Sequence, residues 1–119
     1  MPITWEQESD NLIVARVDGE VGQSETVDFQ DEVTPAIQAQ GAMKLLFILD
    51  NFEGWAIDEG WEDSNFMDEN DPFMKRIAIV GDEKWRDEAL MFTLAGLRPV
   101  NIQYFIPEQE EAARAWLTE

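Results

Sequence analysis

Residues 75–85, Lys-Arg-Ile-Ala-Ile-Val-Gly-Asp-Glu-Lys-Trp, decide the fold that the sequence predicts. The run Ile77–Val80 is wholly apolar, too short for a helix, and closed by Gly81 and Asp82. An apolar run without polar alternation is typical of a strand buried on both faces, as in the parallel sheets of α/β proteins. Because residues 83–85 open a helical pattern, this stretch predicts a buried parallel strand that leads into a helix.

Residues 44–55, Lys-Leu-Leu-Phe-Ile-Leu-Asp-Asn-Phe-Glu-Gly-Trp, repeat that design. An apolar strand over residues 44–50 is followed by an acidic turn, a glycine and a tryptophan. Two such units place Trp55 and Trp85 near the carboxyl edge of one sheet, and ligands of open α/β sheets usually bind at that edge.

The N-terminal part of the chain predicts a hairpin and a helix. Strands over residues 3–7 and 12–18 are separated by a cluster of turn-forming residues. A helix over residues 24–40 follows, with Ser24 suited to be its N-cap. Pro35 lies inside this helical pattern, so we expect either a kink at that point or two shorter segments.

The remaining elements complete the order ββαβαβαβα. They are helices over residues 57–70 and 84–95, a strand over residues 100–106, and a last helix that begins near Pro107. Helix 57–70 has the least regular apolar spacing and many like charges, so we expect it to dock less firmly than the others. Residues 1–119 are thus expected to form a single α/β domain, a mixed, mostly parallel five-stranded sheet with four helices.

The composition excludes several classes of function. The 119 residues contain no cysteine and no histidine, which removes disulfides, thiolate catalysis and the commonest general base and metal ligand. The net charge of −18 repels nucleic acid and anionic membrane surfaces. Membrane-length apolar runs and a signal peptide are lacking, so we expect a cytoplasmic location, with membrane contact at most peripheral.

Four motifs resemble the bacterial SpoIIAA-like family, and the resemblance covers essentially the whole chain. They are Asp50–Trp55, Trp61–Asp63, Ile77–Trp85 and Ala112–Leu117. The resemblance implies a STAS-like fold with helices wound in a βα superhelix, shared in outline with the lipid-carrying CRAL-TRIO domains. It also implies binding of apolar ligands or membranes through a mobile helix.

The same resemblance does not extend to a phosphorylation switch. Phosphorylatable antagonists with the STAS fold carry an Asp-Ser-Ser-Gly type of turn at the start of the helix after the equivalent strand. The corresponding turn here, residues 50–54, is Asp-Asn-Phe-Glu-Gly and has no hydroxyl group. Residues 68–71 are acidic where relatives are often more basic, which disfavours membrane binding in particular.

Large apolar side chains gather near the predicted carboxyl edge and indicate an apolar binding site. In this hypothesis helix 57–70 closes over the strand ends as a mobile lid. The alternative is that the same side chains pack as ordinary core, which is the commoner role of such residues. The ligand-binding candidates are Phe52, Trp55, Trp61, Phe66, Met67, Trp85, Met91 and Phe92.

Polar side chains border these candidates. The predicted polar rim is Asp50, Asn51, Glu53 and Asp82. Paired carboxylates can serve as acid and base or hold Ca²⁺ or Mg²⁺, but acidic residues at turns and helix starts routinely act as caps. We therefore predict no catalytic residue, no metal and no cofactor. The few bases lie at opposite ends of strand 77–80 and predict no nucleic-acid patch.

Taken as a whole, the sequence predicts a non-enzymatic domain that binds an apolar small molecule or a lipid acyl chain. The alternative is a regulatory protein-interaction domain of STAS type, which acts through the same edge without a phosphorylatable serine. Both a monomer and a homodimer are compatible with the sequence, because an edge strand or an open lid would expose apolar surface.

Overall fold

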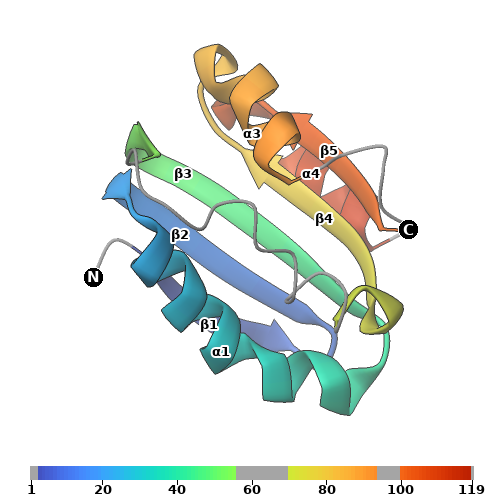
Figure 1. The fold of residues 1–119 in the computed structure, drawn as a ribbon. Coiled ribbons are helices and arrows are strands. Elements are labelled where there is room, and N and C mark those ends of the chain that lie inside the picture. Colours follow the sequence, from blue (N-terminus) through green and yellow to red (C-terminus); the bar gives the residue numbers. More distant parts are fainter. Residues whose placement is uncertain (1–2, 56–69, 94–99, 119) are drawn as a thin grey trace.

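The computed structural model describes residues 3–55, 70–93 and 100–118 (Figure 1). Its strands are β1 (Ile3–Ser9), β2 (Leu12–Val21), β3 (Met43–Trp55), β4 (Met74–Val80) and β5 (Asn101–Phe105). Its helices are α1 (Gln23–Gln40), α3 (Arg86–Phe92) and α4 (Glu110–Leu117), with short 3₁₀ turns at Asp71–Phe73, Glu83–Trp85 and Pro107–Gln109. The helix predicted over residues 57–70 lies, except for its last residue, outside the described residues.

The five strands form one sheet in the order β1-β2-β3-β4-β5. β1 runs antiparallel to β2, and every other neighbouring pair is parallel. One row across the four parallel strands aligns Ile13, Leu45, Ile77 and Ile102. The prediction of a mixed, mostly parallel five-stranded sheet is confirmed.

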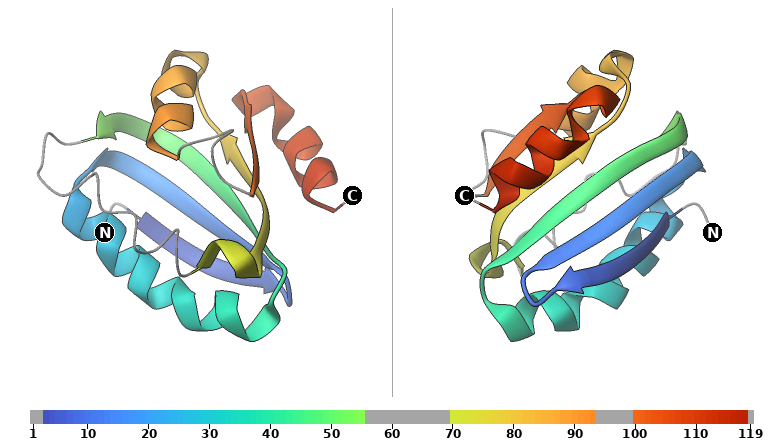
Figure 2. Two further views of the ribbon diagram at one scale, coloured as in Figure 1. Left: turned by 45° about the vertical axis from the view of Figure 1, so that its right-hand side comes forward. Right: turned by 180° about the vertical axis from the view of Figure 1, so that it is seen from behind.

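Helices cover both faces of this sheet. α1 and α3 lie on one face (Figure 1), and α4 lies on the opposite face, over β4 and β5 (Figure 2). Because strand side chains alternate between faces, Ile77 and Ile79 of β4 join the core under α1 and α3, whereas Ala78 and Val80 join the core under α4. The run that decides the fold is thus buried on both sides, as predicted.

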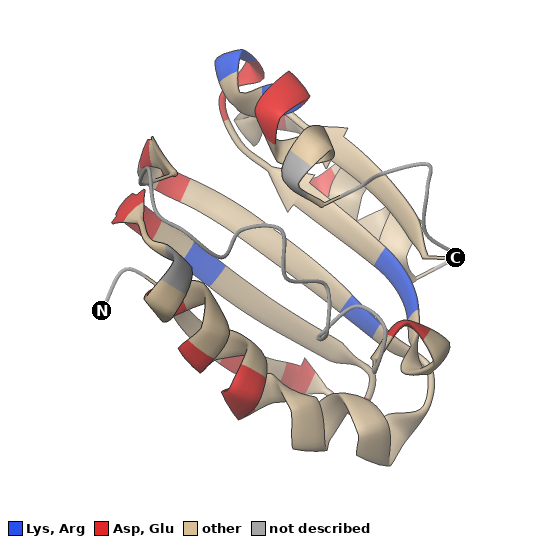
Figure 3. Ribbon diagram, in the orientation of Figure 1, with Lys and Arg blue, Asp and Glu red and all other residues tan. Residues whose placement is uncertain are grey.

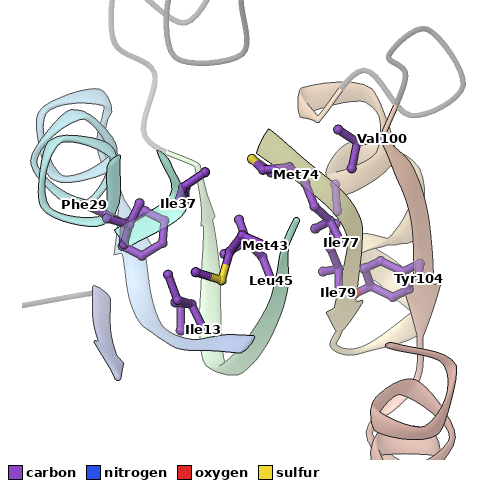
Figure 4. Packing of buried hydrophobic residues seen from close by; sticks show 13 residues of the cluster. Ile13, Phe29, Ile37, Met43, Leu45, Met74, Ile77, Ile79, Val100 and Tyr104 are labelled. Atoms are coloured by element: carbon purple, nitrogen blue, oxygen red, sulfur yellow. The ribbon is translucent and has the colours of Figure 1, made fainter. Parts of the chain in front are cut away.

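The larger core lies between the sheet and the α1/α3 layer (Figure 4). α1 contributes Phe29, Val33 and Ile37, which are at most 5% exposed and follow the three- and four-residue spacing of one helix face. These side chains pack with Ile13 of β2 and Leu45 of β3. This packing fixes α1 along β1, β2 and β3.

On the other face, α4 is held by two buried apolar side chains and by a cation at its C-terminal end. Ala113 and Leu117 are fully buried in the core that also contains Leu46. The Arg76 guanidinium lies 5.0 Å from the centroid of the Trp116 ring and donates from Nη1 to the Trp116 carbonyl. A cation at a helix C-terminus satisfies orphan carbonyls and complements the helix dipole.

One of the two alternatives predicted for Pro35 is wrong, and so is the predicted N-cap of the first helix. α1 continues through Pro35 as one helix, so two shorter segments do not form. Pro35 is exposed, and the carbonyl that its missing N–H leaves unpaired therefore lies on the solvent side. Ser24 is not the N-cap, because the helix begins one residue earlier with Gly22 as its cap, and the Ser24 hydroxyl donates instead to Glu25 Oε2 at 3.0 Å.

The third predicted helix is shorter than the pattern 84–95 indicated. α3 ends at Phe92, with Thr93 as its C-cap. The Thr93 hydroxyl donates to the Ala89 carbonyl at 2.8 Å, which satisfies one of the carbonyls left over at the helix end. The expected cap Gly96 lies outside the described residues.

Candidate binding site

The ends of β2 and β3 extend as a two-stranded ribbon beyond the end of β4. β4 pairs with β3 only as far as Val80, which lies opposite Ile48, whereas β3 continues to Trp55. The turn predicted for residues 50–54 is wrong, because these residues are strand, and Phe52 and Gly54 pair with Gly19 and Glu20 of β2. The carboxyl edge of the sheet, where β2 to β5 end, is therefore stepped rather than even.

Register irregularities in this ribbon determine where its side chains point. The pairing shifts on both sides of Gly19, which has a φ of 74°. Asn51 also lies in the left-handed region, with a φ of 56°. Bulges of this kind bend a strand and redirect its side chains. As a result Leu49, Phe52 and Trp55 all join one apolar cluster on the α1/α3 side of the sheet.

Three rings pack edge to face at this point, and we call Phe52, Trp55 and Trp85 the aromatic cluster. The Phe52 ring centroid lies 4.7 Å from that of Trp55 and 5.0 Å from that of Trp85, and the two indoles are 6.0 Å apart. T-shaped pairs at these distances are favourable beyond the area that they bury. Phe52 is only 8% exposed, whereas both tryptophans are half-buried. The cluster thus has a buried centre and an accessible outer side.

The backbone of β3 makes room for the cluster at Gly54. This residue has a φ of 112°, and a Cβ added to it would lie 3.2 Å from Cη2 of Trp85. Both the conformation and the close approach of the indole therefore require glycine. The Trp85 ring packs directly on the end of β3, which joins the loop after β4 to the ribbon.

A hydrogen bond from β5 fixes the loop that carries Trp85. The Tyr104 hydroxyl donates to the Asp82 carbonyl at 2.7 Å, and the Gly81 amide donates to the Phe105 carbonyl at 2.9 Å. Asp82 acts as the N-cap of the following 3₁₀ turn, since its Oδ1 accepts from the Lys84 amide at 3.0 Å. Capping is therefore the observed role of the predicted rim residue Asp82.

Arg86 braces the same loop. Its Nε and Nη2 donate to the two carboxylate oxygens of Glu83, each at 2.8 Å, and its guanidinium lies 5.2 Å from the centroid of the Tyr104 ring. The hydrogen bond from Arg86 lowers the pKa of Glu83 below its usual value. Burial raises the pKa of Tyr104 to about 12, and the nearby Arg86 charge offsets this only in part.

Tyr104 should make the stability of the fold sensitive to alkaline pH. Its pKa is about 12 in the folded chain against an ordinary 10.0, so its contribution is complete below pH 10.0 and is lost as pH rises from there to about 12. We expect the free energy of unfolding to fall by about 1–2 kcal/mol over that range. Urea unfolding at stepped pH measures this fall.

Tyr104→Phe is the matched control for that titration. Tyr104 is the one tyrosine of the chain, so tyrosinate absorbance reports its ionisation directly. The variant should lose about 1 kcal/mol of stability at neutral pH, from the missing hydroxyl bond, and should unfold with a flatter profile above pH 10. Identical alkaline profiles for the two proteins would contradict the assignment.

Carboxylates concentrate at this edge of the sheet (Figure 3). The exposed residues Asp18, Glu20, Asp50 and Glu53 belong to the ends of β2 and β3, and none of them has an ion-pair partner within the described part of the chain. The amino ends of β3 and β4 instead hold Lys44, Lys75 and Arg76. We call Asp18, Glu20, Asp50, Glu53 and Asp82 the acidic rim.

Trp85 is the best placed of the cluster residues to contact a ligand. Its indole N–H has no hydrogen-bond partner in the ranges that the structure covers. The ammonium of exposed Lys84 lies 5.3 Å from the centroid of its ring, within the range of a cation–π interaction. By contrast, Trp5 donates to Glu32 at 3.0 Å and Trp116 is covered by Arg76.

The structure brings three of the eight predicted ligand-binding residues together. Phe52, Trp55 and Trp85 form the aromatic cluster. Met91 is 62% exposed on α3 and belongs to none of the buried clusters, so the structure does not place it with the rings. Three candidates, Trp61, Phe66 and Met67, lie outside the described residues, as does the side chain of Phe92.

All four predicted rim residues are exposed. They belong to the end of β3 or follow the end of β4, close in sequence to the residues of the aromatic cluster. The structure adds three residues that the sequence did not single out for the site, namely Lys84, Arg86 and Tyr104. Tyr104 could have been suspected from its inward position in the alternating strand 100–106. The contacts of Lys84 and Arg86 depend on the tight 3₁₀ turn at Glu83–Trp85, which no local pattern indicated.

The described residues contain neither a membrane-spanning helix nor a metal-binding group. No helix in those ranges is long and apolar enough to cross a membrane. Across the same ranges, no group of three or more acidic side chains is arranged to hold a metal ion.

Comparison with known proteins assigns this fold to a family. The stepped parallel sheet, its antiparallel first strand and its two helical layers define an α/β protein of the SpoIIAA-like type. A family model described as SpoIIAA-like matches residues 12–118. The chain belongs to the SpoIIAA-like family, and the resemblance seen in the sequence is confirmed.

Solved structures share the fold at low sequence identity. An uncharacterised protein with a SpoIIAA-like fold from Shewanella loihica PV-4 matches with a TM-score of 0.67 and 19% identity, covering 97% of this chain and 91% of that chain. The anti-sigma factor antagonist SpoIIAA in its unphosphorylated form matches with a TM-score of 0.61 and 12% identity, covering 96% of each chain. No curated protein sequence matches the chain significantly. Identities this low carry the fold and not the function.

Proposed function

We propose that this protein is a non-enzymatic binding domain that holds an apolar small molecule or an acyl chain at the carboxyl edge of its sheet. One observation carries the proposal: the aromatic cluster has a buried centre at Phe52 and two half-buried indoles at the ends of parallel strands. In open α/β sheets ligands usually bind at this edge. Apolar pockets are typically lined by such aromatic side chains, with a few polar groups that fix orientation.

The chemistry of the site favours binding over catalysis. The polar groups nearest the cluster are already engaged, because Tyr104 and Asp82 hold the loop and Glu83 is paired with Arg86. A raised tyrosine pKa of about 12 leaves Tyr104 protonated at neutral pH, so it does not act as a base there. An apolar group resting on Trp55 and Trp85 would gain stabilisation from buried area and need no proton transfer.

Decanol, a neutral alkyl probe, tests this proposal. We expect decanol to raise the melting temperature of the protein and to appear as an adduct in native mass spectrometry. Trp85→Ala should weaken decanol binding about tenfold, since one ring contact worth about 1.4 kcal/mol is lost. Trp116→Ala, which removes an indole from the opposite face of the sheet, is the matched control and should leave decanol binding unchanged.

Absence of any adduct and of any thermal shift would overturn the proposal. Equal loss of binding in Trp85→Ala and Trp116→Ala would also contradict it, because the effect would then follow stability and not the site. The stability of both variants is measured in the absence of probe to correct for unfolding.

A protein-interaction domain acting through the same edge is the second candidate. It is supported by the exposed Met91 on α3 and is compatible with the fold that the chain shares with an anti-sigma factor antagonist. Residues 50–54 contain no hydroxyl, so such an interaction would not be switched by phosphorylation of that segment. Lipid extracted from the purified protein would favour the first candidate, whereas specific capture of one protein from lysate would favour the second.

A further inference from the structure

We propose that the apolar ligand of this site carries a positive charge, so that the natural ligand is a cationic amphiphile and not a fatty acid. The inference rests on the proposed function, since it names the ligand class for the same aromatic cluster. Two independent features of the structure carry it: the placement of a lysine ammonium over Trp85, and the charge of the surrounding edge.

The first feature is a cation that the protein itself supplies. The Lys84 ammonium lies 5.3 Å from the centroid of the Trp85 ring, and Lys84 has no ion-pair partner in the part of the chain that the structure describes. The lysine side chain is exposed, so its position over the ring contributes only a small free energy and the ammonium can be displaced. The Trp85 face therefore accepts an ammonium group, and a ligand cation would take the place of Lys84.

The second feature is the uncompensated charge of the exposed carboxylates at the same edge of the sheet. Asp50 and Glu53 flank Phe52 along β3, and Asp18 and Glu20 lie on the neighbouring strand β2. Glu83 is neutralised by Arg86, whereas the members of the acidic rim have no basic partner among the described residues. A carboxylate or phosphate head group would be repelled, and an ammonium head group attracted.

Three probes with the same ten-carbon chain isolate the effect of the head group. They are decyltrimethylammonium, decanol and decanoate, each used below its micelle concentration in low salt. We expect the cation to bind about tenfold more tightly than decanol, and decanoate about tenfold more weakly, because low salt screens the charges of the acidic rim only weakly. In about 1 M salt, where the Debye length falls to about 3 Å, the three affinities should converge.

A matched pair of lysine variants tests the role of Lys84. Lys84→Met removes the internal cation, whereas Lys75→Met removes the same charge from an exposed position at the amino end of β4. Lys84→Met should bind decyltrimethylammonium several-fold more tightly than the wild-type protein does. The affinity of Lys75→Met should equal that of the wild type. Glu53→Gln should weaken the binding of decyltrimethylammonium. Asp10→Asn, which removes the same charge from an exposed site at the β1–β2 turn, is its control and should not.

The outcomes separate this inference from the proposed function. Decanoate binding as tightly as the cation, or equal responses of Lys84→Met and Lys75→Met, would overturn the charge preference while apolar binding stands. Failure of all three probes to bind would overturn both. Cation binding that survives in Trp85→Ala would show simple attraction to the acidic surface and would also overturn the proposal.

Discussion

Gly81→Ala should lower the free energy of unfolding by about 2–3 kcal/mol, the cost of forcing a methyl group into a filled site. A Cβ at this position would lie 2.6 Å from the Tyr104 hydroxyl oxygen and 2.8 Å from Cδ1 of Leu49. Neither neighbour can withdraw easily, because the hydroxyl is hydrogen-bonded to the Asp82 carbonyl and Leu49 is packed in the cluster with Phe52. Urea denaturation followed by far-ultraviolet circular dichroism measures the loss.

A double-mutant cycle with Tyr104→Phe identifies the contact responsible. Tyr104→Phe removes the nearest atom, so Gly81→Ala should be about 1 kcal/mol less destabilising in that background. The cost should not vanish, because the contact with Leu49 remains. Gly41→Ala is a comparison of another kind: its Cβ meets open space and its φ of 80° strains the backbone, so about 1 kcal/mol is expected. Strict additivity in the cycle would contradict the steric explanation.

Strand β4 shows what the sequence could predict. All four residues of Ile77–Val80 are apolar, and successive side chains point to opposite faces of the sheet. Burial of both faces could therefore be predicted from these residues alone. The β1–β2 hairpin and the apolar stripe Phe29-Val33-Ile37 on α1 likewise follow from local patterns. Each is decided within a few residues of chain, and the structure confirms them.

The end of β3 shows where local patterns fail. Asp50-Asn51 and Gly54 are typical turn residues, yet they are strand here. The strand continues because the end of β2 pairs with Phe52, Gly54 and Trp55. That pairing joins residues about thirty positions apart and depends on irregular register, which no short pattern encodes. The convergence of Phe52, Trp55 and Trp85 is a product of that register, so the sequence could indicate their edge but not their contacts.

The contacts of Tyr104 and Arg86 have the same origin. The Tyr104 hydroxyl reaches the Asp82 carbonyl only because β5 lies beside β4, with Tyr104 paired to Ile79. Alternation predicts which face Tyr104 points to, but its partner is set by the neighbouring strand. The candidate site is therefore predictable as a region of the sheet and only partly as a set of residues.

Phe52→Ala should lower the free energy of unfolding by about 3–4 kcal/mol, close to the usual cost of removing a buried phenyl ring. Phe52 is 8% exposed and touches both indoles of the aromatic cluster, so its loss removes two edge-to-face contacts and leaves a cavity between them. The near-ultraviolet circular dichroism of the tryptophans should also weaken, because their relative orientation is no longer fixed. Denaturant unfolding and these spectra measure the two effects separately.

Phe105→Ala on the opposite face is the matched control for Phe52→Ala. The Phe105 ring is partly buried and lies 6.1 Å from Trp116, so its removal should cost less and leave the signals of Trp55 and Trp85 intact. Phe52→Leu should recover much of the stability but not the spectrum, since it refills the volume without a ring. If Phe52→Ala costs under about 1 kcal/mol, the ring does not form the buried centre of the site. The indoles would then lack the rigid support on which selective binding at this edge depends.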